Sequence, residues 1–249
     1  MSSNSFLKIK ININSIKHIL NKKVLYINKK NPLKTYKKMA SKYKLHYFEA
    51  NARAAVARAI LTYAKADWED HRITHEEWGK IKETDLFEFH QMPILEHNGK
   101  KLSQSVAIDL YLLRQFNLYG KNNDDQYEID NLLCTFDDLL PLLGKYAFRC
   151  KDEKEKEEAK KSCIEKCHFY IKKIEERYIK LGKGKYYLGD YFSGADIYLA
   201  SVFPIFCNAL NVMIVKDSGC MDLYNLIVRI KENELKEFHE KVFNKNSPM

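Results

Sequence analysis

The stretch His90–Tyr111, with the sequence HQMPILEHNGKKLSQSVAIDLY, decides the fold of this chain. The apolar run Met92–Leu95 predicts a short strand, and Asn98-Gly99 is a strong signal for a two-residue hairpin turn. Lys101-Leu102 then predicts the returning strand, and Gln104-Ser105 predicts the start of a helix. The sequence therefore predicts a strand, a tight turn, a second strand and a helix in direct succession.

Two residues in this stretch go beyond an ordinary hairpin. Pro93 stands at the first position of a strand, where it need not donate to the ladder and where a cis bond would be a deliberate feature. Ser105 stands where it can cap the helix Val106–Leu113, and where the exposed N–H groups of a helix start attract an anion. Both ends of the unit therefore offer backbone groups at one edge of a sheet.

The composition is that of a globular chain of 249 residues without a predicted transmembrane span. Its six cysteines are scattered through the sequence. Cys163 and Cys167 lie one helical turn apart, but no second pair and no histidine cluster completes a metal site. We therefore expect free thiols in a reducing compartment and no metal cofactor.

The net charge of +9 comes from one end of the chain. Residues 1–44 hold 12 lysines and no acidic residue, so that the remaining 30 basic and 33 acidic residues carry a net charge of −3. A nucleic-acid-binding face on the folded part is therefore not supported, and nucleic acid is not an expected partner. Residues 1–42 form a basic extension that is typical of a mitochondrial transit peptide, although it lacks arginine. We therefore expect a mitochondrial location, with the cytoplasm as the alternative. If residues 1–42 are not a transit peptide, they are expected to be a retained anchoring arm or a solubilising tail.

Residues 43–117 predict a thioredoxin-like domain. Lys44–Phe48 predicts its first strand, and the alanine-rich stretch Ala52–Ala66 predicts an amphipathic helix. Trp68–Ile73 suits the second strand, and Thr74–Glu77 has the pattern of a capping box that starts a short helical segment. With the hairpin and helix described above, the order β, α, β, irregular helix, β, β, α is that of a thioredoxin-like fold.

The second half of the chain predicts a separate, all-α domain over residues 126–249. The polar stretch 118–125 is the predicted linker, and the charged run Lys151–Lys161 is expected to be a solvated helix end or a loop. Ser193–Asp196 predicts a capping box whose role is folding rather than catalysis. The predicted helices cover Tyr127–Leu143, Cys163–Leu181, Ile197–Ala209, Met221–Lys231 and Glu234–Phe243.

This pattern resembles the glutathione transferases, most closely their sigma class, which includes the prostaglandin-D synthase type. The family's motif is a small apolar residue with a cis-proline, a hairpin, and Gln-Ser at a helix start. Met92-Pro93, Asn98-Gly99 and Gln104-Ser105 match it, and the resemblance extends from about Tyr43 to about Phe243. Further matches, in the family's order, are Lys44–Phe48, Trp78 with Lys82, and Thr135–Asp138. The resemblance implies a thioredoxin-like domain followed by an all-helical glutathione-transferase domain.

The resemblance also implies an enzyme that uses glutathione as a substrate, either a glutathione transferase or a glutathione-dependent isomerase. Tyr47 would donate a hydrogen bond to the glutathione sulfur and stabilise its thiolate. The backbone of Met92 would pair with the cysteinyl residue, and Ser105 with Gln104 would hold the γ-glutamyl carboxylate. The implied glutathione-binding residues are Arg53, Trp78, Lys82, Gln91, Met92, Pro93, Gln104 and Ser105, with Asp138 contributed by the partner subunit of a homodimer.

The family's roles also predict where the ends of glutathione and the second substrate would lie. Trp78, Lys82 and Gln91 correspond to positions around the glycyl carboxylate. The unknown apolar electrophile would lie between the loop after Tyr47 and the helix over residues 126–147. Its apolar lining is expected to come from Leu142, Tyr146 and Phe148.

Two loops depart from the family's pattern. Where the family has Arg-Gly-Arg-Ala-Glu, this chain has Asn51-Ala52-Arg53-Ala54-Ala55, and the family's Pro-Phe-Gly is here Glu88-Phe89-His90. The loss of both glycines is expected to change loops beside the tripeptide, because glycine permits conformations that alanine and histidine resist. These departures motivate an alternative, in which the fold survives as a non-catalytic accessory subunit of a large mitochondrial complex that residues 1–42 contact.

Overall fold

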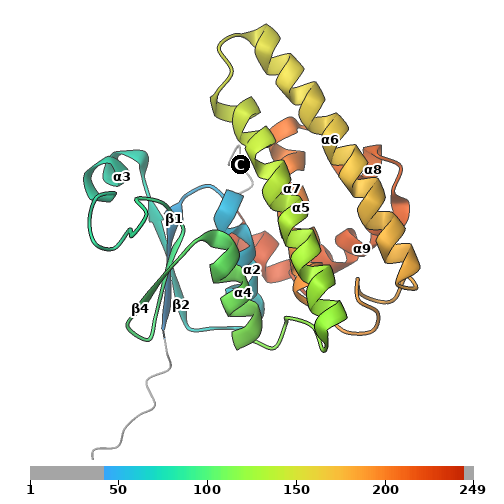
Figure 1. Cartoon of the computed structure of the whole chain (residues 1–249), viewed down its shortest axis with the longest axis horizontal. Coiled ribbons are helices and arrows are strands. Elements are labelled where there is room, and N and C mark those ends of the chain that lie inside the picture. The colour runs from blue at the N-terminus through green and yellow to red at the C-terminus, as the bar shows by residue number, and fades with distance from the viewer. Residues whose placement is uncertain (1–41, 244–249) are drawn as a thin grey trace, which may run out of the picture. The chain divides into compact units, whose positions relative to one another are not determined.

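A computed structural model of the chain describes residues 42–243, and the extension predicted over residues 1–42 lies, apart from Lys42, outside the described residues. Its strands form one mixed sheet in the order β2-β1-β3-β4 (Figure 1). The strands are β1 (Tyr43–Phe48), β2 (Trp68–Ile73), β3 (Ile94–His97) and β4 (Lys100–Ser103). β1 and β2 are parallel, whereas β1 with β3 and β3 with β4 are antiparallel.

Alternation along β1 sends its side chains to opposite faces of the sheet. Leu45 and Tyr47 are buried in the main core, together with side chains of helices α2 (Ala55–Tyr63) and α4 (Ser105–Gln115), which lie on one side of the sheet (Figure 1). The other face has a small core of its own, centred on the buried Phe87 and Ile94. Helix α3 (His75–Ile81) contributes Trp78 and Ile81 to this small core, so the sheet is covered on both faces.

The rest of the described chain is helical. Its elements are α5 (Asn123–Phe148), α6 (Glu153–Lys180), α7 (Gly194–Leu210), α8 (Ile214–Asp217), α9 (Met221–Glu232) and a final π-helical turn, η2 (Phe238–Val242). Helix α7 is buried along most of its length and packs against α2, α5 and α9, so it links the sheet to the helical half. The predicted fold class, a thioredoxin-like domain followed by an all-helical domain, is confirmed.

Some predicted boundaries differ from the structure in the first half of the chain. The helix expected over Ala52–Ala66 begins with a 3₁₀ turn, η1 (Ala52–Ala54), before α2. Helix α2 ends at Tyr63, because Lys65 adopts a left-handed φ of 51° and its N–H bonds to the Thr62 carbonyl at 3.1 Å.

The helical half shows similar differences. Asn122 caps α5 by accepting a hydrogen bond from the Asp125 N–H at 2.9 Å, so α5 begins at Asn123, inside the predicted linker. Asp152 caps α6 in the same way, which makes the charged run from residue 151 to residue 161 mostly the first turns of α6. The helix expected over Glu234–Phe243 is reduced to the π-helical turn η2.

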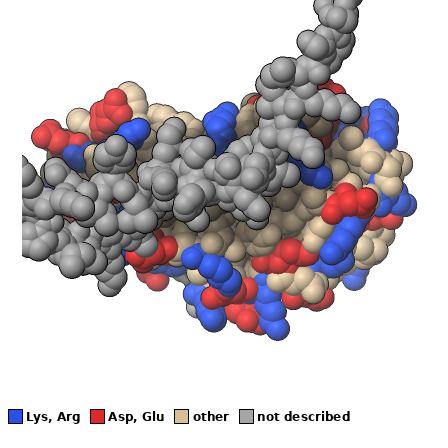
Figure 2. All heavy atoms as spheres, turned by 90° about the horizontal axis from the view of Figure 1, so that it is seen from below, with Lys and Arg blue, Asp and Glu red and all other residues tan. Residues whose placement is uncertain are grey.

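The described surface carries charges of both signs. Figure 2 shows one face, on whose coloured part Lys and Arg are interspersed with Asp and Glu. All six cysteine thiols are free. Within residues 42–243, no group of His, Cys, Asp and Glu is arranged to hold a metal ion, and no helix there is long and apolar enough to cross a membrane.

Asp196 fixes the start of α7. Its carboxylate accepts hydrogen bonds from the N–H of Tyr187 at 2.8 Å, from the N–H of Ser193 at 2.9 Å and from the Ser193 hydroxyl at 3.1 Å. The side chain is fully buried. Burial raises the pKa of Asp196 to about 6, although its hydrogen bonds oppose this shift. The Asp196 carboxylate, which stabilises the start of α7, is thus part of the protein core.

We expect Asp196→Ala to lower the free energy of unfolding by about 3 kcal/mol, because it leaves buried donors without an acceptor. Asp152→Ala is a matched control, because Asp152 caps α6 on the exposed surface with one hydrogen bond from the Glu155 N–H at 2.8 Å. That change should cost about 1 kcal/mol. Urea unfolding followed by circular dichroism measures both, and equal losses would contradict a core role for Asp196.

Candidate active site

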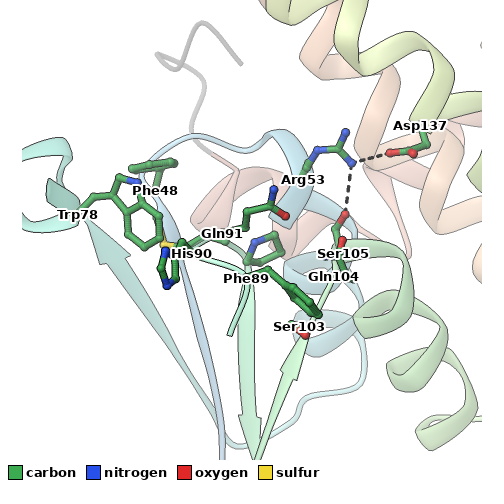
Figure 3. Close-up of a pocket in the computed structure, with 12 residues that line it drawn as sticks. Phe48, Arg53, Trp78, Phe89, His90, Gln91, Ser103, Gln104, Ser105 and Asp137 are labelled. Atoms are coloured by element: carbon green, nitrogen blue, oxygen red, sulfur yellow. Dashed lines mark hydrogen bonds and ion pairs between the residues drawn. The ribbon is translucent and has the colours of Figure 1, made fainter. Parts of the chain in front are cut away.

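A pocket of about 460 Å³ lies where the hairpin, η1 and α5 meet (Figure 3). The aromatic rings of Trp78 and Phe48 lie at one end of it, and Arg53 and Asp137 lie at the other. It is lined by Phe48, Arg53, Trp78, Phe89, His90, Gln91, Met92, Pro93, Ser103, Gln104, Ser105 and Asp137.

The start of α4 forms one wall of the pocket. Gln104 adopts φ 68° and ψ 113°, a left-handed conformation that is uncommon for a residue with a side chain. The Ile108 N–H is bonded to the Gln104 carbonyl at 2.9 Å, which leaves the N–H groups of the first turn, from Ser105 onward, without an intrahelical partner. A helix start with such donors suits a carboxylate.

Arg53 joins three elements at this wall. Its Nη1 donates to Asp137 Oδ1 at 2.5 Å and to the Ser105 hydroxyl at 3.5 Å (Figure 3). Arg53 comes from η1, Ser105 from α4 and Asp137 from α5, so residues far apart in the sequence build one polar cluster. The cation is neutralised by Asp137 while it still faces the pocket.

Asp137 was missed by the sequence analysis, which singled out its neighbour Asp138. Successive residues of a helix point about 100° apart, so only one of the two carboxylates faces Arg53. Asp138 is exposed and accepts a hydrogen bond from the Tyr170 hydroxyl at 3.3 Å. The Thr135–Asp138 motif contained both carboxylates, but the direction of each depends on how α5 packs.

The opposite end of the pocket is aromatic. The rings of Phe48 and Trp78 meet edge to face with their centres 6.0 Å apart, and Trp78 meets Phe87 in the same way at 4.9 Å. The Met92-Pro93 peptide bond, beside them, is cis. Lys82 lies outside the pocket, exposed at the end of α3.

Tyr47 lies beside this pocket, at the end of β1. It lines a neighbouring pocket of about 200 Å³, to which Arg53 and Arg149 also contribute. Burial raises the pKa of Tyr47, although the backbone of Arg53, which hydrogen-bonds to the phenol, and the charges of Arg53 and Arg58 oppose the shift. The phenol is therefore protonated at neutral pH and can donate a hydrogen bond into the pocket.

Two of the side chains predicted to line the electrophile site, Leu142 and Tyr146, do not line this second pocket. Leu140 and Gly144, four residues apart on one side of α5, face it. Leu142 and Tyr146 each lie two residues further along the helix, so they point in nearly the opposite direction, and they are partly buried against the main core. Phe148 does not line it either and is 67% exposed.

Both positions where the family's glycines are replaced have left-handed backbone conformations. Ala52 has φ 29° and His90 has φ 49°. A side chain in this region costs free energy that glycine avoids, so these loops keep a glycine-like path despite the substitutions. Since Ala52 adjoins Arg53 and His90 adjoins Gln91, the backbone that positions the pocket is retained.

The structure thus brings most of the predicted glutathione-binding residues to one place. Those lining the first pocket are Arg53, Trp78, Gln91, Met92, Pro93, Gln104 and Ser105, whereas Lys82 and Asp138 lie outside it. Lining residues that the sequence analysis did not name as binding residues are Phe48, Phe89, His90, Ser103 and Asp137. Phe89 and His90 belong to one of the two loop departures, and Phe48 and Asp137 belong to stretches that match the family's pattern.

Comparison with known proteins agrees with this geometry. The family model for the glutathione S-transferase N-terminal domain matches residues 43–114, and that for the C-terminal domain matches residues 137–244. Mouse hematopoietic prostaglandin D synthase is 31% identical over 189 residues, which cover 76% of this chain and 88% of that protein. The chain belongs to the glutathione S-transferase family.

Other members of the glutathione S-transferase family show the same extent of similarity. Glutathione S-transferase 4 of Caenorhabditis elegans is 28% identical over 203 residues, covering 80% of this chain and 90% of that protein. A solved structure of the rat enzyme, hPGDS complexed with a quinoline, has a TM-score of 0.69 at 27% identity and covers 80% of this chain and 96% of that one. The predicted resemblance to the prostaglandin-D synthase type is confirmed, and the family is one of enzymes.

Proposed function

We propose that this protein is a glutathione transferase that conjugates glutathione to small electrophiles or isomerises a substrate with its help. The observation that carries the proposal is the convergence of a buried, protonated Tyr47 with Arg53 beside a pocket whose wall is a helix start at Ser105. A phenol O–H and a guanidinium at one point favour a thiolate over a thiol. Tyr47 is thus the residue that would hold the glutathione sulfur as its nucleophilic anion.

The remaining contacts of glutathione follow from the pocket's chemistry. The N–H groups and hydroxyl at Ser105, with Gln104, suit the γ-glutamyl carboxylate. The backbone of Met92, which precedes the ladder of β3, suits antiparallel pairing with the cysteinyl residue. Trp78 and Gln91 flank the glycyl end, and Lys82 would have to swing in from the end of α3 to reach it.

Further parts of the proposal concern assembly and location. We propose a homodimer in which Asp138, exposed on α5, contacts the glutathione amine in the other subunit. Many members of this family are dimers, which supports the assembly. A mitochondrial location remains a proposal that rests on the composition of residues 1–42, with the cytoplasm as the alternative.

The second candidate function is a non-catalytic accessory subunit of a mitochondrial complex. It is favoured by one observation, the replacement of the family's glycines by Ala52 and His90 at left-handed positions. A side chain at such a position costs free energy that glycine avoids, and this cost motivates the alternative. The two candidates predict different assay results.

The test is conjugation of glutathione to a chloronitrobenzene by the full-length chain and by its Tyr47→Phe variant. We expect activity in the parent, and a loss of about 10- to 100-fold in kcat/KM in Tyr47→Phe, because the variant lacks the donor to the sulfur. The ultraviolet absorbance of bound glutathione should show a higher thiol pKa in the variant. The dissociation constant of glutathione should change by less than about threefold, since Tyr47 contacts only the sulfur.

Tyr146→Phe is the matched control, because Tyr146 lies on α5 but packs against the core rather than lining either pocket. It should leave kcat/KM unchanged. Folded protein that binds glutathione but conjugates nothing in any variant would favour the accessory subunit. Equal activity in the parent and in Tyr47→Phe would exclude Tyr47 as the thiolate-stabilising residue.

A further inference from the structure

A second, smaller cavity lies directly behind the wall that Ser105 and Arg53 form. Its volume is about 30 Å³, and its polar lining consists of Arg53, Ser105, Asp109, Asp137 and Tyr198. The elements that carry Arg53, Ser105 and Asp137 in the first pocket, η1, α4 and α5, therefore also line this cavity, and α7 adds Tyr198. A void of this size holds one water molecule when enough polar atoms surround it.

Asp109 has an unusual position in this cavity. It follows Ser105 by one turn of α4 and is only 4% exposed. Its Oδ2 accepts a hydrogen bond from the Tyr198 hydroxyl at 3.0 Å, whereas its Oδ1, although shielded from solvent, has no hydrogen-bond partner among the described residues. A buried carboxyl oxygen without a partner is costly, so packing alone does not explain an acid here.

The surroundings of this acid favour its un-ionised form. Burial raises the pKa of Asp109 well above its usual range, and the hydrogen bond from Tyr198 offsets only part of that. Among the residues that line this cavity, Asp137 on α5 is the other acid, and the cation Arg53 is bonded to Asp137. Burial first, and then its hydrogen bond to Asp109 and the charges of Asp130 and Asp137, raise the pKa of Tyr198, so its hydroxyl remains a donor.

We propose that Asp109 is a positioning residue of the glutathione site, whose un-ionised carboxyl binds one water molecule in the small cavity and through it holds Ser105 and Arg53. A neutral carboxyl can accept from Tyr198 through one oxygen and donate an O–H to the water through the other. The water then has Ser105 and Asp137 as further partners. This inference rests on the proposed function, since it assigns Asp109 to the binding of the γ-glutamyl carboxylate at Ser105.

The neutral state matters for the ligand. A charged Asp109 would lie one helical turn from an anionic carboxylate bound at Ser105, and like charges at that distance repel in a poorly solvated site. It would also attract Arg53 away from Asp137. A neutral acid supplies the hydrogen bonds without either effect, and asparagine, which carries one acceptor oxygen and one donor group, supplies the same pattern.

The experiment compares Asp109→Asn with Asp109→Leu in the full-length chain. The dissociation constant of S-methylglutathione, whose blocked sulfur removes any contribution from thiol ionisation, is measured at pH 6.5 by calorimetry. We expect Asp109→Asn to bind within about twofold of the parent and Asp109→Leu to bind about tenfold more weakly while unfolding at the same temperature or higher. If Asp109→Leu binds S-methylglutathione as tightly as the parent, the positioning role is wrong. If Asp109→Asn binds it as weakly as Asp109→Leu, the claim that the carboxyl acts in its neutral form is wrong.

A second measurement does not depend on the leucine variant folding. The infrared difference spectrum of the parent minus Asp109→Asn at pH 7 should contain the carbonyl stretch of a protonated carboxylic acid. If it contains only carboxylate bands, the proposal is wrong. If the parent does not bind S-methylglutathione, the proposed function and this inference are both rejected. If the parent binds it and both Asp109 variants bind it equally well, only the inference is rejected.

Discussion

Replacing Arg58 with alanine is expected to lower the free energy of unfolding by about 4 to 5 kcal/mol, the largest effect on stability that we anticipate. The Arg58 side chain is completely buried on α2. Its Nε donates to Asp70 Oδ1 at 3.0 Å, and its Nη1 and Nη2 donate to the carbonyls of Ala50 at 2.5 Å and Phe48 at 2.9 Å. Alanine would remove the donor from all three acceptors, which lie in partly buried residues, and would leave an empty volume in the core.

The same change is also expected to disturb the backbone beside Tyr47. Arg58 binds the carbonyls of Phe48 and Ala50, and its guanidinium lies 5.8 Å from the centre of the Tyr47 ring. Without it the turn from β1 into η1 loses its anchor, so we expect weaker conjugating activity even in the fraction that remains folded.

Arg72→Ala provides the control for Arg58→Ala. Arg72 donates to the same carboxylate, Asp70 Oδ2, at 2.8 Å, and to the carbonyls of Val242 at 2.7 Å and Glu49 at 3.3 Å, but its side chain is 27% exposed. Its loss should cost about 1 kcal/mol. Denaturant unfolding with the m-value checked gives both numbers, and a loss below about 2 kcal/mol for Arg58→Ala would show that the buried guanidinium is not an anchor.

Replacing Arg53 with methionine is expected to reduce kcat/KM for glutathione conjugation by about 100- to 1,000-fold, if the proposed function holds. Arg53 is the one described residue that lines the first pocket, the second pocket beside Tyr47 and the small cavity behind them. Methionine preserves much of the side-chain volume while it removes the bonds to Asp137 and Ser105 and the charge near Tyr47. The effect should appear in both KM and kcat, because binding and thiolate stabilisation are lost together.

Arg149→Met is the matched control for this prediction. Arg149 also lines the second pocket, the one beside Tyr47. It is exposed at the end of α5, outside the cluster that Arg53 forms with Ser105 and Asp137. It should change kcat/KM by less than about threefold for a neutral electrophile. Steady-state kinetics at fixed pH decides the matter. Similar losses for the two arginines would mean that net positive charge, rather than the hydrogen bonds of Arg53, is what the site needs.

The elements that the sequence predicted well are those whose signals are local. The hairpin at Asn98-Gly99 and the capping box at Thr74 depend on residues within a few positions of each other, and both form as expected. The strand Trp68–Ile73 has the predicted bounds because the turn at Lys65 precedes it and the capping box at Thr74 follows it directly. That most of the residues expected to bind glutathione line one pocket was also predictable, because the resemblance supplied long-range information that spacing alone lacks.

The features that were missed depend on tertiary packing. The rotation of α5 about its axis, as it packs against α7, decides which of Asp137 and Asp138 faces Arg53. It also decides whether Leu140 or Leu142 lines the second pocket. Such a rotation leaves no signature in a helix with apolar residues on several sides. Asp109 was missed for the same reason, since only the structure shows that its position on α4 is enclosed by α5 and α7.

The division of the site between the two halves of the chain has a consequence for how the protein can diverge. Nearly every group expected to contact glutathione comes from residues 43–115, whereas the wall expected to face the electrophile comes from α5. The described polar contact that ties the two together within the pocket is the one between Arg53 and Asp137. If the proposed function holds, mutations along α5 would exchange one electrophile for another while the nucleophile stays intact, provided that an acceptor for Arg53 is kept. Substrate range and nucleophile activation would then be nearly independent traits.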